Sequence, residues 1–177
     1  MLVYIQSENG WSTTAYILGR EDFTEGFDDG WDGRFLEGDA AAPQLYALTP
    51  DGEMVVNSVP EIEGTVMMFR KGSADNNYTF TFKYDGDEVW YLNDQKEQTS
   101  TLISNETSYP FVSATGDNAA RFVISKTSYN APAITTGVDN VQGDDVQGTK
   151  VRKVIYKDKL YIIRGGRVYN AEGALVK

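Results

Sequence analysis

Tyr78-Thr79-Phe80-Thr81-Phe82-Lys83-Tyr84 alternates aromatic with polar side chains, and this is the clearest structural signal in the chain. Successive side chains of a β-strand point to opposite faces of a sheet. The pattern therefore puts the aromatic rings against a core and leaves the Thr and Lys side chains facing solvent. It predicts a half-buried strand.

Similar short runs rich in Val, Ile, Thr, Tyr and Phe recur about every ten residues, separated by Gly, Asp, Asn and Pro. No long helical period competes with them. Further strands are predicted at Leu2–Gln6, Thr14–Leu18, Gln44–Leu48, Met54–Val59, Thr65–Arg70, Val89–Asp94, Thr107–Val112 and Ala120–Ser125. The pattern predicts an all-β fold, an antiparallel β-sandwich of jelly-roll or Ig-like type, over residues 1–126.

Two turns have a composition typical of β-hairpins. Thr49-Pro50-Asp51-Gly52 lies between two apolar runs and supplies a fixed φ at Pro and a positive φ at Gly. Tyr84-Asp85-Gly86-Asp87 has a similar composition. Both are therefore predicted to join neighbouring antiparallel strands.

The last third of the chain changes character. Residues 127–149 are mostly Ser, Thr, Asn, Asp, Gln and Gly, which predicts a polar linker. Residues 150–177 then return to short apolar runs at Val151–Tyr156, Leu160–Arg164, Val168–Asn170 and Leu175-Val176. They predict a small β-meander, too small to be stable without packing on something else.

Composition excludes several kinds of chemistry. The 177 residues include no Cys and no His, so thiol nucleophiles, imidazole bases and the usual zinc ligands are absent. Residues 1–149 hold 24 acidic and 8 basic side chains, whereas residues 150–177 hold 2 acidic and 8 basic. An acidic body repels phosphate backbones, which argues against nucleic acid as a partner.

Neither a membrane-spanning helix nor an N-terminal signal peptide is predicted from the sequence. No stretch approaches the roughly 20 apolar residues that a spanning helix needs. Met1–Trp11 lacks the basic and apolar regions of a signal peptide. Because Leu2–Gln6 already has strand character, we interpret Met1 as a start codon added to an excised fragment.

A series of motifs across residues 2–125 resembles a known kind of module. In order along the chain they are Gly26–Gly33, Ala42–Tyr46, Asp51-Gly52, Val55–Pro60, Tyr78–Phe80, Val89–Asp94 and Ala120–Val123. Together they resemble a β-sandwich module found near the C-termini of large surface and secreted proteins of the Bacteroidetes. The tail from Lys153 to Lys177 resembles the C-terminal sorting segments of the type IX secretion system, but it lacks their Tyr-Pro-Asn-Pro opening.

The resemblance implies a function without catalysis. It implies a C-terminal accessory module that supports, spaces or presents a larger N-terminal region of a secreted or cell-surface bacterial protein, with adhesion as a further role. The expected partners are the N-terminal domains of the parent protein, with cell-surface glycans or secretion machinery as further candidates. The expected location is extracellular or at the cell surface, associated with the outer membrane.

The acidic loop from Glu25 to Asp39 is a candidate metal site. Asp28, Asp29 and Asp32 lie close in sequence, and carboxylate oxygens suit Ca²⁺. The loop does not follow the EF-hand pattern, because Gly30 stands at the third position counted from Asp28. The alternative is a turn held by Asx hydrogen bonds and glycines at positive φ. Apart from this structural Ca²⁺, no cofactor is expected. A glycosidase built on the same carboxylates would need a cleft, for which the sequence gives no indication.

Three tryptophans are candidate ligand-binding residues. Trp31, Trp11 and Trp90 could offer flat faces for stacking on sugar rings, which makes a carbohydrate-binding module the competing hypothesis. Trp90 and Tyr91 are adjacent in a predicted strand, so only one of them can face the core. Trp31, in the acidic loop, is expected to be the most exposed ring. The alternative is that all three pack in the core or under loops. For Arg121 we expect an internal ion pair with a loop carboxylate such as Asp28 or Asp32.

Overall fold

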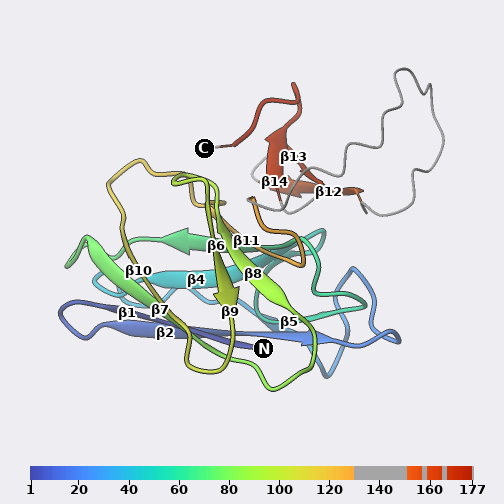
Figure 1. Ribbon diagram of the computed structural model, residues 1–177, viewed down its shortest axis with the longest axis horizontal. Coiled ribbons are helices and arrows are strands. Elements are labelled where there is room, and N and C mark those ends of the chain that lie inside the picture. Colours follow the sequence, from blue (N-terminus) through green and yellow to red (C-terminus); the bar gives the residue numbers. More distant parts are fainter. Residues whose placement is uncertain (130–150, 157–158, 165–166, 177) are drawn as a thin grey trace.

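The computed structural model in Figure 1 describes residues 1–129, 151–156, 159–164 and 167–176. Over these ranges the secondary structure consists of β-strands, without a helix. The strands are β1 (Leu2–Ser7), β2 (Ser12–Gly19), β3 (Gly33–Arg34), β4 (Gln44–Thr49), β5 (Gly52–Val59), β6 (Thr65–Arg70), β7 (Asn77–Lys83), β8 (Trp90–Asp94), β9 (Thr99–Ile103), β10 (Ser108–Val112), β11 (Phe122–Ser125), β12 (Val151–Tyr156), β13 (Lys159–Arg164) and β14 (Arg167–Asn170). The all-β prediction is confirmed.

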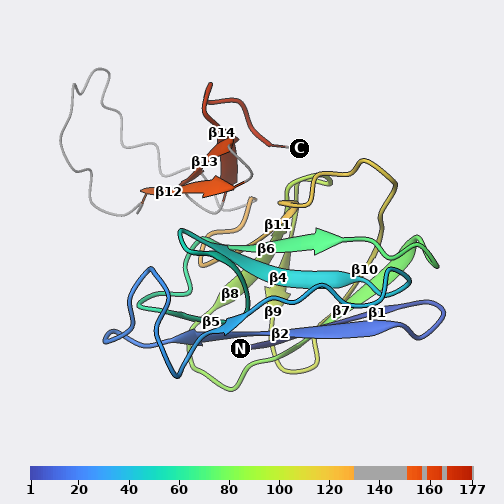
Figure 2. The ribbon, with the colours of Figure 1, turned by 180° about the vertical axis from the view of Figure 1, so that it is seen from behind.

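Strands β1 to β11 form one continuous sheet. Its order is β10-β7-β1-β2-β5-β4-β6-β11-β8-β9, with β3 beside β5. The sheet curls into a nearly closed, barrel-like shape. In both views β1, β2 and β7 form one layer and β4, β6 and β11 the other (Figures 1 and 2).

The sheet is mixed, so the prediction of a purely antiparallel sandwich is wrong. Strands β2 and β5 run parallel, with Ile17 beside Asn57. The chain leaves β2 through residues 20–43, crosses to β4 and returns through β5. Parallel neighbouring strands need such a crossover connection. A crossover has no tight-turn motif, so the sequence does not indicate which strand will pair with which.

The main core lies between the two layers. Tyr78, Phe80 and Phe82 of β7 are buried, whereas Thr79 and Thr81 between them are half-buried and Lys83 is exposed. The period-2 prediction for this strand is confirmed. The rings pack on Phe111 and Phe122, with centroids 5.1 Å apart for Phe80 and Phe111. Each fully buried side chain of this size contributes about 1.5–3 kcal/mol, so this cluster dominates the packing energy.

Side chains connect β10, which is one open edge of the sheet, to β8, which lies next to the other edge strand. Arg121 and Asp94 form a buried ion pair, with Nη2 to Oδ2 at 2.6 Å and Nε to Oδ1 at 2.8 Å. From the β10 side, Tyr109 donates its hydroxyl to Asp94 at 2.8 Å. Arg121 in turn donates to the Val112 carbonyl of β10 at 2.8 Å. The Arg121–Asp94 pair therefore links β8 and β10, whose backbones are not hydrogen-bonded to each other.

Of the two predicted hairpin turns, one is confirmed and the other is wrong. Thr49–Gly52 joins the paired strands β4 and β5, with Gly52 at a φ of 119°. Tyr84–Asp87 lies between β7 and β8, which are not neighbours in the sheet. Its composition makes a turn, but the two strands belong to different parts of the curled sheet.

The C-terminal strands β12, β13 and β14 form a separate antiparallel sheet, as predicted for the meander, and Leu175 bridges to Tyr169. Side chains of these C-terminal residues pack on the outer face of the layer that contains β4 and β6. The buried side chains of this contact are Ile163, Val168 and Val176 from the C-terminal sheet, and Tyr46, Leu48, Val66, Met68, Ala120 and Val123 from the body. We call residues 151–176 the cap.

Most of the predicted linker, residues 130–149, lies outside the described residues. Within the described ranges there is no helix with the length and apolar character of a membrane span.

Candidate functional site

The three predicted tryptophans do not come together in the structure. Trp31 is 49% exposed and Trp11 is 41% exposed, whereas Trp90 is 1% exposed. Trp90 lies in the main core and donates its ring N–H to the Tyr84 hydroxyl at 3.1 Å, so it offers no face to a ligand. Its neighbour Tyr91 is half-buried, as expected for opposite faces of a strand.

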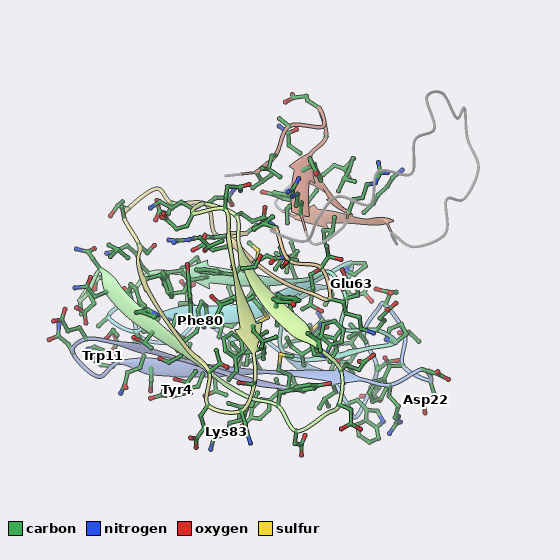
Figure 3. The ribbon with its side chains drawn as sticks, in the orientation of Figure 1. Tyr4, Trp11, Asp22, Glu63, Phe80 and Lys83 are labelled. Carbon is green, nitrogen blue, oxygen red and sulfur yellow. The ribbon has the colours of Figure 1, made fainter. Side chains whose placement is uncertain are left out.

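Trp11 and Trp31 lie near opposite ends of β2. Trp11 directly precedes this strand, and the loop that contains Asp22 and Trp31 follows it. Figure 3 labels Trp11 and Asp22, which lie at opposite ends of the molecule. A shared aromatic platform is therefore not formed, and Trp31 must be considered with its own surroundings.

Trp31 borders an open groove of about 830 Å³. The groove lies where β2 ends and where Pro60–Ile62 lead into β6. Apolar side chains such as Leu18 and Ile62 line it together with the charged side chains of Arg20, Glu61, Glu88 and Lys126. This mixture of rings, aliphatic carbons and charges is typical of sites for small polar ligands.

Arg20 covers part of the Trp31 ring. Its guanidinium carbon lies 4.5 Å from the Trp31 centroid and 4.3 Å from the Phe23 centroid, so it lies against both rings, which also pack on each other with centroids 5.3 Å apart. Arg20 also forms an exposed ion pair with Asp22, in which Nη2 donates to Oδ2 at 3.0 Å. This hydrogen bond holds the pKa of the Asp22 carboxyl below its usual value. A ligand stacking on Trp31 would have to share the ring with Arg20.

The second cation of the groove is also engaged. Lys126 donates to the Glu88 carboxylate at 2.5 Å, and its ammonium lies 4.9 Å from the Trp90 centroid. The hydrogen bond with Glu88 raises the pKa of Lys126. Both Arg20 and Lys126 therefore already have a carboxylate and an aromatic partner.

The carboxylates of the acidic loop are directed at backbone N–H groups. Asp28 accepts from the Thr24 N–H at 2.7 Å, and Asp32 accepts from the N–H groups of Asp28 at 2.8 Å and Ser58 at 2.5 Å. Gly30 has a φ of 81°. These are the Asx hydrogen bonds and positive φ of the alternative to a metal site.

Asp29 is exposed. In the part of the chain that the structure describes, three or more acidic side chains do not gather anywhere in a geometry suited to a metal ion. The structure thus gives the predicted Ca²⁺ site at Asp28, Asp29 and Asp32 no converging ligands. The same orientation leaves the loop without a facing carboxylate pair of the kind that glycosidases use.

Arg121 has the structural role that the sequence suggested, but with a different partner. It pairs with Asp94, and not with Asp28 or Asp32. Asp94 stands at the end of a predicted strand, where its carboxylate was not recognised as a partner. Both side chains are at most 2% exposed.

The chain is distantly similar to a bacterial fimbrial subunit. Over 186 aligned residues it is 28% identical to the minor fimbrium subunit Mfa5 of Porphyromonas gingivalis. The alignment covers 96% of this chain but only 14% of Mfa5, so the chain corresponds to a small part of that protein. No protein-family profile matches the chain, and no solved structure matches it.

Proposed function

We propose that the chain is a non-catalytic module of a larger, fimbria-associated cell-surface protein, which it supports and presents. The observation that carries the proposal is the match of nearly the whole chain to a short part of Mfa5. A module of this kind needs a stable, self-contained core and does not need a reactive centre. Its fold alone names no activity, so the proposal rests on this similarity together with the geometry of the polar groups.

The placement of the polar groups supports a structural role. Asp94 and Arg121 are used to link β8 to β10, and Asp28 and Asp32 are used to fix the loop. Carboxylates committed to backbone N–H groups are poorly placed for acid–base chemistry, which needs a group within reach of a substrate proton. The partners would then be the other domains of the parent protein, located at the outer surface of the cell.

The two parts of the chain would have different roles. The body, residues 1–126, is the presenting module. The cap, joined to it through residues 127–149, either completes the module by packing or serves in export. Its packing on Tyr46 and Val123 supports the first role, and its resemblance to sorting segments supports the second.

The test is deletion in the parent gene. A parent lacking the whole module should be made but lost from the cell surface, as measured by surface biotinylation and by antibody labelling of intact cells. A second strain lacking only the cap separates its two roles. If the parent protein stays in the periplasm, the cap serves in export. If the parent protein is exported and then degraded, the cap stabilises the module by packing. Normal surface levels and normal fimbriae without residues 1–177 would refute the proposal.

A second candidate is a carbohydrate-binding module, favoured by the 49% exposure of Trp31 beside the groove. The test is a glycan array with the whole chain. Trp31→Ala should abolish saturable binding, while Trp11→Ala, a similarly exposed tryptophan near the other end of β2, should leave it unchanged. Equal loss in both variants, or binding that persists without Trp31, would exclude this site.

A further inference from the structure

We propose that a second pocket, at the other end of β6 from the Trp31 groove, binds the carboxylate of an acidic sugar such as a uronic or sialic acid. The pocket has a volume of about 450 Å³, within the usual range of roughly 300–1,000 Å³ for small-molecule sites. Arg70 and Lys71 supply its cations, and the exposed Ser73 and Thr115 supply hydroxyl groups. This inference is independent of the fimbrial role and of the Trp31 groove.

Arg70 has donors to spare. Its guanidinium carbon lies 5.5 Å from the Tyr46 centroid and 5.7 Å from the Phe35 centroid, so the two rings hold it in place. Its one carboxylate contact is a long one, 3.4 Å from Nη1 to Glu37, whose side chain is 71% exposed. Among the described residues, its buried Nε–H has no acceptor. A guanidinium positioned by rings and weakly paired is well suited to bind a planar carboxylate through two hydrogen bonds.

Lys71 adds an uncompensated charge. Its ammonium donates to the Gly72 carbonyl at 3.0 Å, and among the described residues no carboxylate lies within ion-pair distance of it. The acidic group on the far wall, Asp117, is already bound by Lys96 at 3.0 Å and by the Ala114 N–H at 2.9 Å. The lining therefore holds two cations, Arg70 and Lys71, and two carboxylates, Glu37 and Asp117, but Asp117 is already paired with Lys96 and Glu37 makes only the long contact with Arg70.

The walls of the pocket are fixed before any ligand arrives. Ser73 donates its N–H to the Ala40 carbonyl at 2.8 Å, which ties two of the lining loops together. These loops touch at Gly72, where an added Cβ would lie 2.0 Å from the Ala41 oxygen. On the third loop, Asp117 and Ala114 are joined by two backbone-directed hydrogen bonds. A preorganised pocket loses little conformational entropy on binding.

The hydroxyl groups favour a sugar acid over a bare anion. A phosphate or sulfate ion would use the two cations alone, and the hydroxyl groups of the exposed Ser73 and Thr115 would then have no role in binding. A sugar ring extends from its carboxylate to hydroxyl groups that these side chains can contact. The expected ligand is thus a single acidic sugar unit, at the end of a glycan or free.

The test uses the whole chain and four probes: glucuronate, N-acetylneuraminate, glucose and inorganic phosphate, titrated by calorimetry and by saturation-transfer NMR. One or both acidic sugars should bind, and glucose and phosphate should bind at least about tenfold more weakly, because glucose has no carboxylate for the two cations and phosphate has no ring hydroxyls for Ser73 and Thr115. Equal binding of glucose, equal binding of phosphate, or no binding of either acidic sugar would each overturn the proposal.

Three variants locate the site. Lys71→Gln should weaken acidic-sugar binding about tenfold, while Lys83→Gln, which removes the same charge from exposed β7, should change it less than twofold. Thr115→Trp fills the pocket from an exposed loop position and should abolish binding with every charge kept. Equal effects of Lys71→Gln and Lys83→Gln, or full binding by Thr115→Trp, would show that the anion associates with the surface in general. Melting curves of all variants exclude loss of folding as the cause.

Discussion

Replacement of Asp94 by Asn should strongly destabilise the protein, because it leaves the Arg121 guanidinium charged and buried. The two side chains are 1% and 2% exposed, so water cannot replace the lost partner. The nearest other carboxylates, on Glu97 and Asp117, lie 3.6 and 3.7 Å from the guanidinium and are only partial substitutes. Breaking one side of a buried pair costs about 3–5 kcal/mol.

That cost is large compared with the total stability of about 5–15 kcal/mol that is usual for a domain. For a chain of this length each kcal/mol shifts the melting temperature by roughly 2–4 °C, so a decrease of about 6–20 °C is expected. Thermal and urea unfolding, followed by circular dichroism, measure it. Asp22→Asn is the matched control, because the Arg20–Asp22 pair is 49% and 67% exposed and its loss should leave the melting curve close to that of the wild type.

A double-mutant cycle sharpens the result. Arg121→Met alone should also destabilise, because the Val112 carbonyl and the Asp94 carboxylate lose a donor. Combined with Asp94→Asn it should add little further loss, with a coupling energy of about 2 kcal/mol or more. If the two effects simply add, or if Asp94→Asn melts like Asp22→Asn, the ion pair does not hold β8 and β10 together.

Three further changes test other parts of the structure. Val168→Asp puts a charge into the buried contact between cap and body and should make the cap sensitive to limited proteolysis, whereas Arg164→Asp at an exposed position should not; equal protection would refute the packing. Burial alone would raise the pKa of Asp117, but hydrogen bonds from Ala114 and Lys96 outweigh burial and hold this pKa below its usual value of 3.8. The ionised Asp117 carboxylate therefore stabilises the fold fully above about pH 4, and this stabilisation is lost as the pH falls through the lowered pKa. The stability difference between the wild type and Asp117→Asn, from urea unfolding, should therefore be constant near neutral pH and shrink below about pH 4. Chelators and millimolar Ca²⁺ should leave the melting temperature unchanged, because Asp28 and Asp32 face backbone N–H groups; a clear rise with Ca²⁺ would restore the metal site.

Local signals in the sequence predicted the strands well. The alternation at residues 78–84 gave β7 with its buried face, and Thr65–Arg70 was predicted at both ends as observed for β6. Two strands are not predicted from the sequence. Thr99–Ile103 is β9, an edge strand made largely of Thr and Ser with little apolar contrast, and Gly33–Arg34 is too short to carry a pattern.

Partner choice was harder to predict than strand position. Nothing local to Tyr84–Asp87 indicates that the strands on either side separate, and nothing local to Ile17 indicates a parallel neighbour at Asn57. These pairings follow from how the whole sheet curls around its aromatic core. The candidate site shows the same limit: the exposure of Trp31 could be anticipated from its loop, but not the stacking of Arg20 upon it.

The positions of the arginines link the fold to the two candidate binding sites. All four arginines before residue 150 lie over aromatic rings: Arg20 over Phe23 and Trp31, Arg34 over Phe27, Arg70 over Phe35 and Tyr46, and Arg121 over Phe111 and Phe122. Most charged side chains in this part of the chain are acidic. Stacking on a ring holds each guanidinium in a fixed position and limits how many neighbouring carboxylates can reach it. Arg121 then uses its donors on Asp94, and Arg20 uses its donors on Asp22. Arg70 is fixed in the same way but has only the long contact with Glu37, and Lys71 beside it has no carboxylate among the described residues. Arg34 donates to the Asp51 carbonyl instead. Among the described residues, Arg70 thus combines ring stacking and one long carboxylate contact with a neighbouring Lys71 ammonium that has no carboxylate partner, which is the arrangement that an acidic ligand would complete.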